Sequence, residues 1–215
     1  MHVRDIMVTK VIVAPPEMSL SEALKLMLSH RIRHLPIVDS HNHLVGIISD
    51  RDLSDAIPSI FDSKPKEDVM SLPVSKVMVK NVITALPDDF VEEAAHMMTE
   101  QQISCLPVEE NGDLIGIITE TDLLNILVKL TGADLPTSRL EIDVPNETGQ
   151  LSDVSDVIKR HKINIHSVLV YPSFSNPTRQ TLVFRIQCMD MRGLLSSLKE
   201  KHYKIVWPQD MEMTQ

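Results

Sequence analysis

Hydrophobic and polar positions repeat along the first part of the chain. Residues 3–53 and 74–123 align with a single one-residue gap, and hydrophobic residues match hydrophobic residues nearly everywhere. The segment LVGIISDRDL at 44–53 returns as LIGIITETDL at 114–123. An internal repeat of this kind predicts two copies of one structural unit, and therefore one fold for both.

Each copy carries local signals for the same order of elements. Ser19 and Glu22 form a capping-box pair that opens an apolar-periodic helix. The segment LPIVD then predicts a strand, and LVGII predicts another strand after a turn. In the second copy, Asn111 and Gly112 are a hairpin signal between CLPVEE and LIGII. We expect strand, helix, strand, strand and helix in each copy.

The pattern changes near residue 138. RLEIDV, INIHSVLVY, QTLVFRIQ and YKIVW alternate like strands, whereas LSDVSDVIKRH and RGLLSSLKEKH are amphipathic like helices. Their order is βαββαβ, which is the ferredoxin-like arrangement. The fold class is therefore α+β or α/β, with two repeats packed as a pair before a ferredoxin-like domain. The expected divisions are 1–60 for the first repeat, 61–73 for a connection that contains Pro65 and Pro73, 74–133 for the second repeat and 138–209 for the last domain.

Composition narrows the class of protein. The chain has 215 residues, of which 43% are hydrophobic and 3% aromatic, so Ile, Leu, Val and Met must form its cores. A formal charge of −9 argues against general binding to nucleic acids or anionic membranes. No apolar run reaches the roughly 20 residues that span a bilayer, and the first residues lack a signal-peptide core. Cys105 and Cys188 lie in apolar runs, which predicts reduced thiols in a cytoplasmic protein.

Three short motifs recur at matching positions of the two copies. The first copy has Asp5-Ile6-Met7, Leu35-Pro36-Ile37 and Gly46-Ile47-Ile48-Ser49-Asp50-Arg51-Asp52, and the second has Val77-Met78, Leu106-Pro107-Val108 and Gly116-Ile117-Ile118-Thr119-Glu120-Thr121-Asp122. Lys76 stands where the first copy has Asp5. On these motifs the repeated block resembles a pair of cystathionine-β-synthase (CBS) domains, the arrangement called a Bateman module.

The resemblance implies that an adenine nucleotide (AMP, ADP or ATP) or a related adenosyl compound binds in clefts between the copies, as a ligand and not as a catalytic cofactor. A carboxylate at a strand–helix junction can accept hydrogen bonds from ribose hydroxyls. The preceding hydroxyl and free N–H groups of the helix start suit a phosphate. Carried over through the motifs, one cleft consists of Val11, Ile32, Arg33, Pro36, Thr119 and Asp122, and its quasi-equivalent consists of Val82, Ile103, Ser104, Pro107, Ser49 and Asp52.

The two expected clefts differ in charge. Arg33 would add a positive charge for phosphate to the first cleft, whereas Ser104 occupies the matching position of the second. We therefore expect unequal binding, with the Asp122 cleft occupied if only one is. An alternative is that both Ser/Thr-x-x-Asp segments only cap their helices. The two roles are compatible.

The last domain is similar to an ACT domain. The segment Asn146-Glu147-Thr148-Gly149-Gln150-Leu151 and the pair Asn164-Ile165 carry this resemblance, although family members often have Pro where Thr148 stands. It implies dimerisation, or binding of an amino-acid effector by Asn146, Gly149 and Asn164 at a dimer interface. Asn146 would otherwise be a turn residue. The order CBS–CBS–ACT resembles the acetoin-utilisation protein B type of bacteria.

These observations favour a regulatory protein over an enzyme. The chain has no G-x-x-x-x-G-K, G-x-S-x-G or H-E-x-x-H motif. His30, His34, His41 and His43 gather in one stretch, but no Cys, Asp or Glu constellation completes a metal site there. We expect a homodimer that senses a nucleotide and acts on a regulated enzyme. The alternative is a module that docks on an enzyme or transporter without a ligand.

Overall fold

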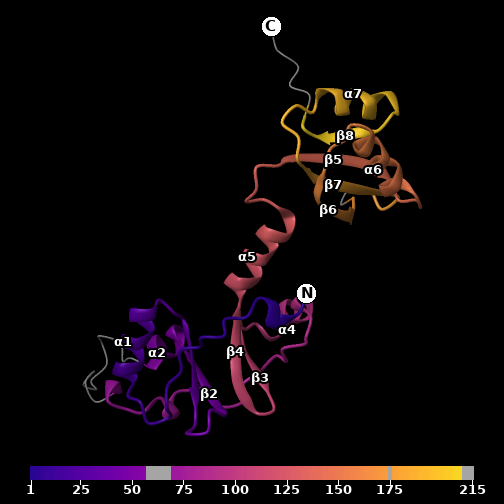
Figure 1. Cartoon of the computed structure of the whole chain (residues 1–215). Coiled ribbons are helices and arrows are strands. Elements are labelled where there is room, and N and C mark those ends of the chain that lie inside the picture. Colours follow the sequence, from indigo (N-terminus) through magenta and orange to yellow (C-terminus); the bar gives the residue numbers. More distant parts are fainter. Residues whose placement is uncertain (57–68, 174–175, 210–215) are drawn as a thin grey trace. The chain divides into compact units, whose positions relative to one another are not determined.

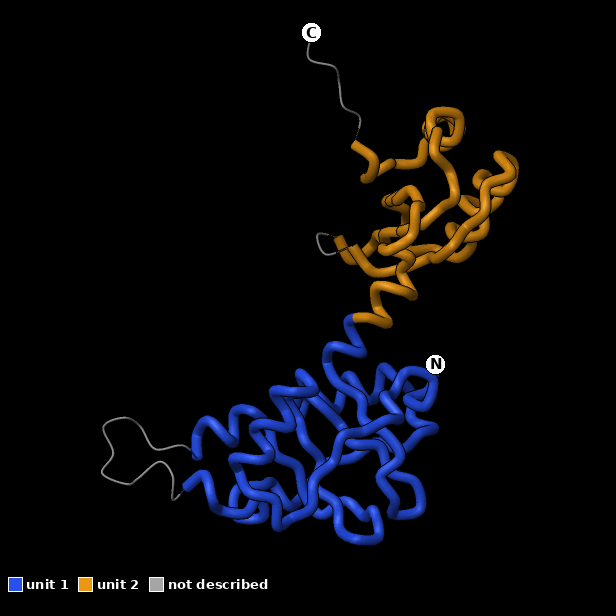
Figure 2. The backbone as a smooth tube through the Cα atoms, turned by 60° about the vertical axis from the view of Figure 1, so that its left-hand side comes forward, with its two compact units in different colours: residues 1–124 blue, residues 125–215 orange. Residues whose placement is uncertain are grey.

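The computed structural model describes residues 1–56, 69–173 and 176–209, and it divides into two compact units, Met1–Leu124 and Asn125–Gln215 (Figure 2). Part of the connection predicted at 61–73, including Pro65, lies outside the described residues. Within the described residues, no helix is long and apolar enough to cross a membrane.

The first unit contains the two repeats, except that the last helix of the second repeat continues into the second unit (Figure 1). The first repeat has η1 (Val3–Asp5), α1 (Leu20–His30), β1 (His34–Val38), β2 (Leu44–Ser49) and α2 (Asp50–Ala56), and the second has η2 (Val74–Lys76), α4 (Val91–Gln101), β3 (Cys105–Glu110), β4 (Asp113–Thr119) and α5 (Glu120–Thr131). Strands β1 and β2 form one antiparallel hairpin and β3 and β4 the other, with Pro36 opposite Ile47 and Pro107 opposite Ile117. The two copies therefore have one fold, as the repeat predicts.

The predicted helix start at Ser19 is confirmed. The Oγ of Ser19 accepts a hydrogen bond from the Glu22 N–H at 3.3 Å, and the Glu22 carboxylate accepts one from the Ser19 N–H at 3.1 Å. The first strand expected in each copy is reduced to single parallel bridges at Ala14 and Ala85. Pro15 follows Ala14 directly and has no N–H to extend such a ladder.

The repeats exchange their first segments. Val3 is fully buried in the core of the second repeat with Leu106 and Ile118, and Val74 is fully buried in the core of the first with Leu35 and Ile48. Single bridges continue this exchange, because Ile47 pairs with Val79 and Val8 pairs with Ile117. Each repeat therefore completes the hydrophobic core of the other.

The second unit has the predicted βαββαβ order. It contains β5 (Ser138–Pro145), α6 (Gln150–Arg160), β6 (Ile165–Pro172), β7 (Arg179–Ile186), α7 (Arg192–Glu200) and β8 (Lys204–Trp207) in a sheet of order β6-β7-β5-β8. Alternate residues of the strands pack against both helices in one core that includes Leu140, Phe184, Val157 and Leu198. The ferredoxin-like prediction is confirmed.

Candidate ligand-binding site

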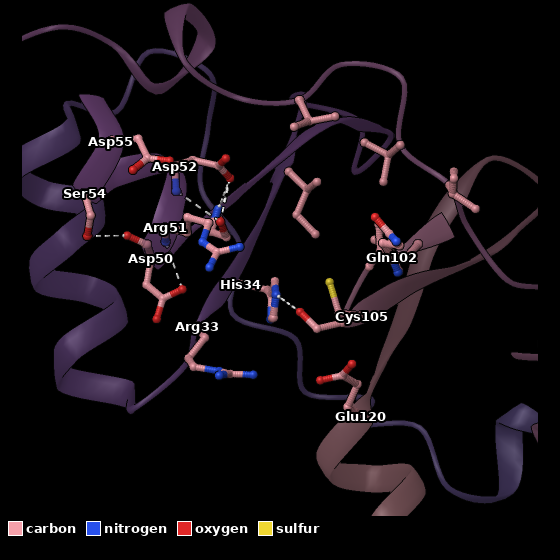
Figure 3. Close-up of a pocket in the computed structure, with 18 of the residues that line it drawn as sticks. Arg33, His34, Asp50, Arg51, Asp52, Ser54, Asp55, Gln102, Cys105 and Glu120 are labelled. Atoms are coloured by element: carbon pink, nitrogen blue, oxygen red, sulfur yellow. Dashed lines mark hydrogen bonds between the residues drawn. The ribbon is translucent and has the colours of Figure 1, made fainter. Parts of the chain in front are cut away.

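A pocket of about 890 Å³ lies between the two repeats (Figure 3). Its walls come from β1, β2 and α2 of the first repeat, and from residues 79–83, 102–107 and Glu120 of the second. This volume falls in the range of about 300–1,000 Å³ that is usual for small-molecule sites. The pocket can therefore accommodate a ligand of nucleotide size.

The pocket brings together one of the two residue sets that the resemblance implies. All six residues of the second set line it, namely Ser49, Asp52, Val82, Ile103, Ser104 and Pro107. Of the first set, only Arg33 lines this pocket, and Val11, Ile32, Pro36, Thr119 and Asp122 are not among its lining residues.

Arg33 thus lines the same pocket as Ser104, although the sequence comparison assigns them to different clefts. The Arg33 carbonyl accepts a hydrogen bond from Asp50 N–H at 3.0 Å, and the Ser104 carbonyl accepts one from Glu120 N–H at 3.1 Å. A hydrogen bond of 2.9 Å between His34 Nε2 and Ser104 Oγ then joins the starts of β1 and β3. The position that distinguishes the repeats therefore lies where they meet.

The hydroxyl and acid of each repeated decapeptide form a capping pair. Asp52 Oδ2 accepts hydrogen bonds from Ser49 N–H and Ser49 Oγ, both at 2.7 Å. Asp122 Oδ2 likewise accepts from Thr119 N–H at 2.9 Å and from Thr119 Oγ1 at 2.7 Å. Among the described residues, no donor bonds Oδ1 of either carboxylate. Capping therefore leaves one carboxylate oxygen of Asp52 available to a ligand.

The start of α2 lacks the free N–H groups that we expected to suit a phosphate. Ser49 N–H donates to Asp52 and Asp50 N–H donates to the Arg33 carbonyl. Arg51 N–H donates to Asp50 Oδ1 at 2.9 Å, and Asp52 N–H donates to Ser49 Oγ at 3.2 Å. Two of these four groups are occupied by carboxylates of the same short helix, so α2 does not form a phosphate cradle.

The electrostatic environment of the pocket is mixed. Its charged side chains are Arg33, Arg51, Asp50, Asp52, Asp55 and Glu120. Burial, together with the charge of Arg33, lowers the pKa of His34 below its usual 6.5, so this imidazole is neutral at physiological pH. Burial raises the pKa of Cys105 to about 12. The Cys105 thiol therefore stays protonated and does not supply a nucleophile.

Four of the charged lining residues, Asp50, Arg51, Asp55 and Glu120, were not among the predicted site residues. Asp50, Arg51 and Glu120 occupy the variable positions between the hydroxyl and the acid of the repeated motif. Asp55 lies three residues after Asp52, on the same side of α2. Helical spacing from the motif acid could have identified Asp55.

Two of the four histidines in the histidine-rich stretch, His41 and His43, lie in the turn between β1 and β2. Asp39 Oδ1 accepts hydrogen bonds from the N–H groups of His41 and His43, at 2.8 and 2.9 Å. Among the described residues, no group of three or more His, Cys, Asp or Glu side chains could hold a metal ion.

The ACT-like residues lie at two ends of one sheet. Asn146 N–H donates to the Thr178 carbonyl at 2.9 Å, whereas Asn164 Nδ2 donates to Gln187 Oε1 at 3.4 Å. Thr178 and Gln187 flank β7, so about 30 Å of extended chain separates them. One amino acid cannot contact both asparagines of the same chain. Gly149, with φ of 97°, directly precedes α6 in a conformation that favours glycine.

Fold and site together define a class: two interlocked α/β repeats with a ligand-sized pocket between them, followed by a ferredoxin-like domain. Residues 3–59 and 74–129 match the CBS domain family, and residues 138–201 match the ACT domain family. The chain belongs to the CBS domain family, with two tandem domains and a C-terminal ACT domain.

Several curated relatives are similar over the CBS region. A homoserine O-acetyltransferase of Methanococcus vannielii is 38% identical over 51% of this chain, and an L-aspartate semialdehyde sulfurtransferase of Methanocaldococcus jannaschii is 37% identical over 56%. The chain spans only 21% and 22% of these two proteins. A CBS domain-containing protein of Dictyostelium discoideum is 38% identical over 52% of this chain and 81% of its own length.

Three solved structures share the fold of the CBS pair. The CBS domain pair of protein MJ0100, in complex with 5′-methylthioadenosine and S-adenosyl-L-methionine, is 33% identical, with a TM-score of 0.52 over 60% of this chain and 97% of that one. CBSX2 in complex with AMP is 27% identical, with a TM-score of 0.53 over 60% and 96%. An acetoin utilization protein (AcuB) of Vibrio cholerae is 32% identical, with a TM-score of 0.55 over 62% and 95%.

Proposed function

We propose that this chain is a non-catalytic regulatory protein that binds an adenosyl ligand in the pocket between its CBS repeats. The observation that carries the proposal is the Asp52 carboxylate, whose Oδ1 is unbonded among the described residues, in a pocket that is also lined by the apolar side chains of Ile47, Val79, Val82 and Ile103. This arrangement suits a ribose beside a flat base. The adenosyl ligands and AMP in the complexes of two similar structures support the choice of ligand.

The ligand acts by shifting a population of conformations. The pocket is built from both repeats, so a bound ligand contacts both at once. It therefore stabilises the arrangement of the repeats that fits it best, by the difference between its affinities for the two arrangements. The regulated partner senses that arrangement, directly or through the ACT domain.

The test compares two matched variants by calorimetric titration with AMP and S-adenosylmethionine. Asp52→Ala and Asp122→Ala remove equivalent capping carboxylates from the two repeats, but only Asp52 lines the pocket. A carboxylate–hydroxyl bond contributes about 1.5–3 kcal/mol, so Asp52→Ala should weaken binding about 10–150-fold. Asp122→Ala should lose similar stability and keep its affinity. Loss of binding in Asp122→Ala alone would move the site to the other predicted cleft.

A thermal-shift screen separates this proposal from the docking alternative. AMP, ADP, ATP, 5′-methylthioadenosine and S-adenosylmethionine are each added to the full chain. A sensor unfolds at a higher temperature with the ligand that it binds. A stable dimer that responds to none of them would favour a module that docks on an enzyme or transporter without a ligand.

The biological setting belongs to the same proposal. The domain order and the similarity to the Vibrio cholerae protein support a role in acetoin utilisation, in the cytoplasm, as a homodimer. On strand β6, Ile165, Leu169 and Val170 are 37%, 42% and 48% exposed, which supports pairing of ACT domains through this edge. A monomer by light scattering would contradict the dimer. Normal growth of a deletion strain on acetoin would contradict the pathway.

A further inference from the structure

The charged side chains of the pocket do not suit a polyphosphate. Two guanidinium groups, those of Arg33 and Arg51, line the pocket together with four carboxylates, those of Asp50, Asp52, Asp55 and Glu120. Among the described residues, none of these six side chains forms an ion pair. His34 adds no charge at physiological pH, because burial and Arg33 lower its pKa. The lining is therefore net negative, and each further phosphate of a ligand meets repulsion.

The start of α2 does not compensate for this charge. All four N–H groups from Ser49 to Asp52 have partners within the protein, and α2 has only seven residues. A triphosphate chain relies on cations and free N–H groups to replace its water. The cations that this pocket offers are two arginines among four carboxylates. The desolvation of the phosphates would remain largely unmatched.

The same lining complements a ligand that carries both signs of charge. Arg33 directly precedes β1 in the first repeat, and Glu120 is the first residue of α5 in the second repeat. Their side chains extend toward each other in Figure 3. A carboxylate on the ligand would pair with the arginines. An ammonium or sulfonium centre would pair with Glu120, Asp50 or Asp55. Unpaired side chains of both signs in one pocket favour such a zwitterionic or cationic group.

We propose that this pocket selects adenosyl compounds whose 5′ substituent is neutral, zwitterionic or cationic, and rejects adenosine di- and triphosphates. This inference rests on the proposed function and names the class of ligand for the same pocket. Affinity should fall in the order S-adenosylmethionine, 5′-methylthioadenosine, AMP, ADP and ATP. The order follows the charge at the 5′ position, since the adenine and the ribose ring with its 2′- and 3′-hydroxyls are common to all five.

The test is calorimetric titration of the full chain with S-adenosylmethionine and ATP at low salt. The parent should bind S-adenosylmethionine at least about tenfold more tightly than ATP. Glu120→Gln removes one carboxylate, and among the described residues that carboxylate has no hydrogen bond to lose. Because a charge in a partly exposed pocket acts over several ångströms, the ratio of the two dissociation constants should change about five- to tenfold in favour of ATP.

Glu110→Gln is the matched control, because it makes the same change of net charge at an exposed residue that does not line the pocket. It should leave the ratio unchanged. Raising the salt should also narrow the difference between the two ligands in the parent, since salt screens exposed charges. If ATP binds as tightly as S-adenosylmethionine, or Glu120→Gln leaves the ratio unchanged, the selectivity is refuted while the adenosyl site stands. If none of the five compounds binds, the proposed function itself fails.

Discussion

Replacing Gly46 with alanine should push β2 of the first repeat away from the segment of the second repeat, at Met78 and Val79, that lies against it. A Cβ at this position would lie 2.5 Å from Met78 Sδ, 2.9 Å from Met78 Cγ and 3.0 Å from the Val79 carbonyl oxygen. Favourable contacts between heavy atoms need about 3.5–4.0 Å. The Met78 side chain can rotate, but the Val79 carbonyl is held by a hydrogen bond of 2.9 Å from Ile47 N–H. Gly46→Ala must therefore displace backbone.

Gly116 is the quasi-equivalent position in the second repeat, and there we expect a smaller loss of stability. There the three atoms nearest to an added Cβ all belong to the side chain of Met7, with Sδ at 2.5 Å, Cγ at 3.0 Å and Cβ at 3.4 Å. Overpacking a core costs about 1–3 kcal/mol. We assign about 2–3 kcal/mol to Gly46→Ala and about 1 kcal/mol to Gly116→Ala. With about 3–6 °C per kcal/mol for a domain of this size, the losses in Tm should be about 6–18 °C and 3–6 °C.

Differential scanning calorimetry of the full chain measures both losses. Gly193→Ala in α7 is the control, because its Cβ would meet His161 Cε1 at an ordinary 3.6 Å and alanine favours a helix by about 0.5–1 kcal/mol. Ile47 and Val79 also line the pocket, so Gly46→Ala should weaken ligand binding as well. Equal losses in the two repeats, or no loss at Gly46, would refute the argument that backbone contact sets the cost.

Two further predictions concern pH. Because burial and Arg33 lower the pKa of His34 below 6.5, the unfolded chain takes up this proton first as pH falls. Stability should therefore decline below pH 6.5. The urea concentration at the unfolding midpoint should fall less for His34→Gln than for the parent between about pH 7 and pH 5. Midpoints that fall in parallel for the two proteins would contradict this. Burial raises the pKa of Asp143, but hydrogen bonds and charge from Arg179 and Lys204 outweigh it and hold that pKa below 3.8. Asp143→Asn should cost about 1–3 kcal/mol at pH 7, and this cost should shrink as the pH falls below 3.8 and the parent carboxyl takes up its proton. A cost that does not change with pH would count against the ion pairs.

The elements of the fold that depend on local signals could be predicted from the sequence. The capping box at Ser19 and the hairpin at Asn111 each act over a few residues, so their sequence is sufficient. The exchange of Val3 and Val74 between repeats could not be predicted in this way. Both copies have nearly the same apolar pattern, so an apolar segment fits either core equally well. Only the path of the chain decides which core it enters.

In the candidate site too, the capping contact within one repeat could be predicted from the sequence, whereas contacts between the repeats could not. The motif predicts Ser49 and Asp52 as a pair, because hydroxyl and acid three residues apart meet on a helix start. It does not predict that Arg33 lines the pocket beside Ser104, since that depends on how β1 and β3 approach each other. Nor does it predict that the Asp50 carboxylate accepts a hydrogen bond from the Arg51 N–H. Under the proposed function, this hydrogen bond would favour a less anionic ligand over a phosphate.

The sequence difference between the repeats would favour one orientation of a bound ligand. The first repeat has Arg33 and Arg51 where the second has Ser104 and Thr121, so both arginines of the pocket come from one copy. Under the proposed function, a ligand with its ribose at Asp52 would hold its anionic group beside those arginines. Its cationic group would then face Glu120 at the first residue of α5 in the other copy. Because Arg33 and Arg51 come from the first repeat and Glu120 from the second, such a ligand would be held in one orientation and would contact both repeats.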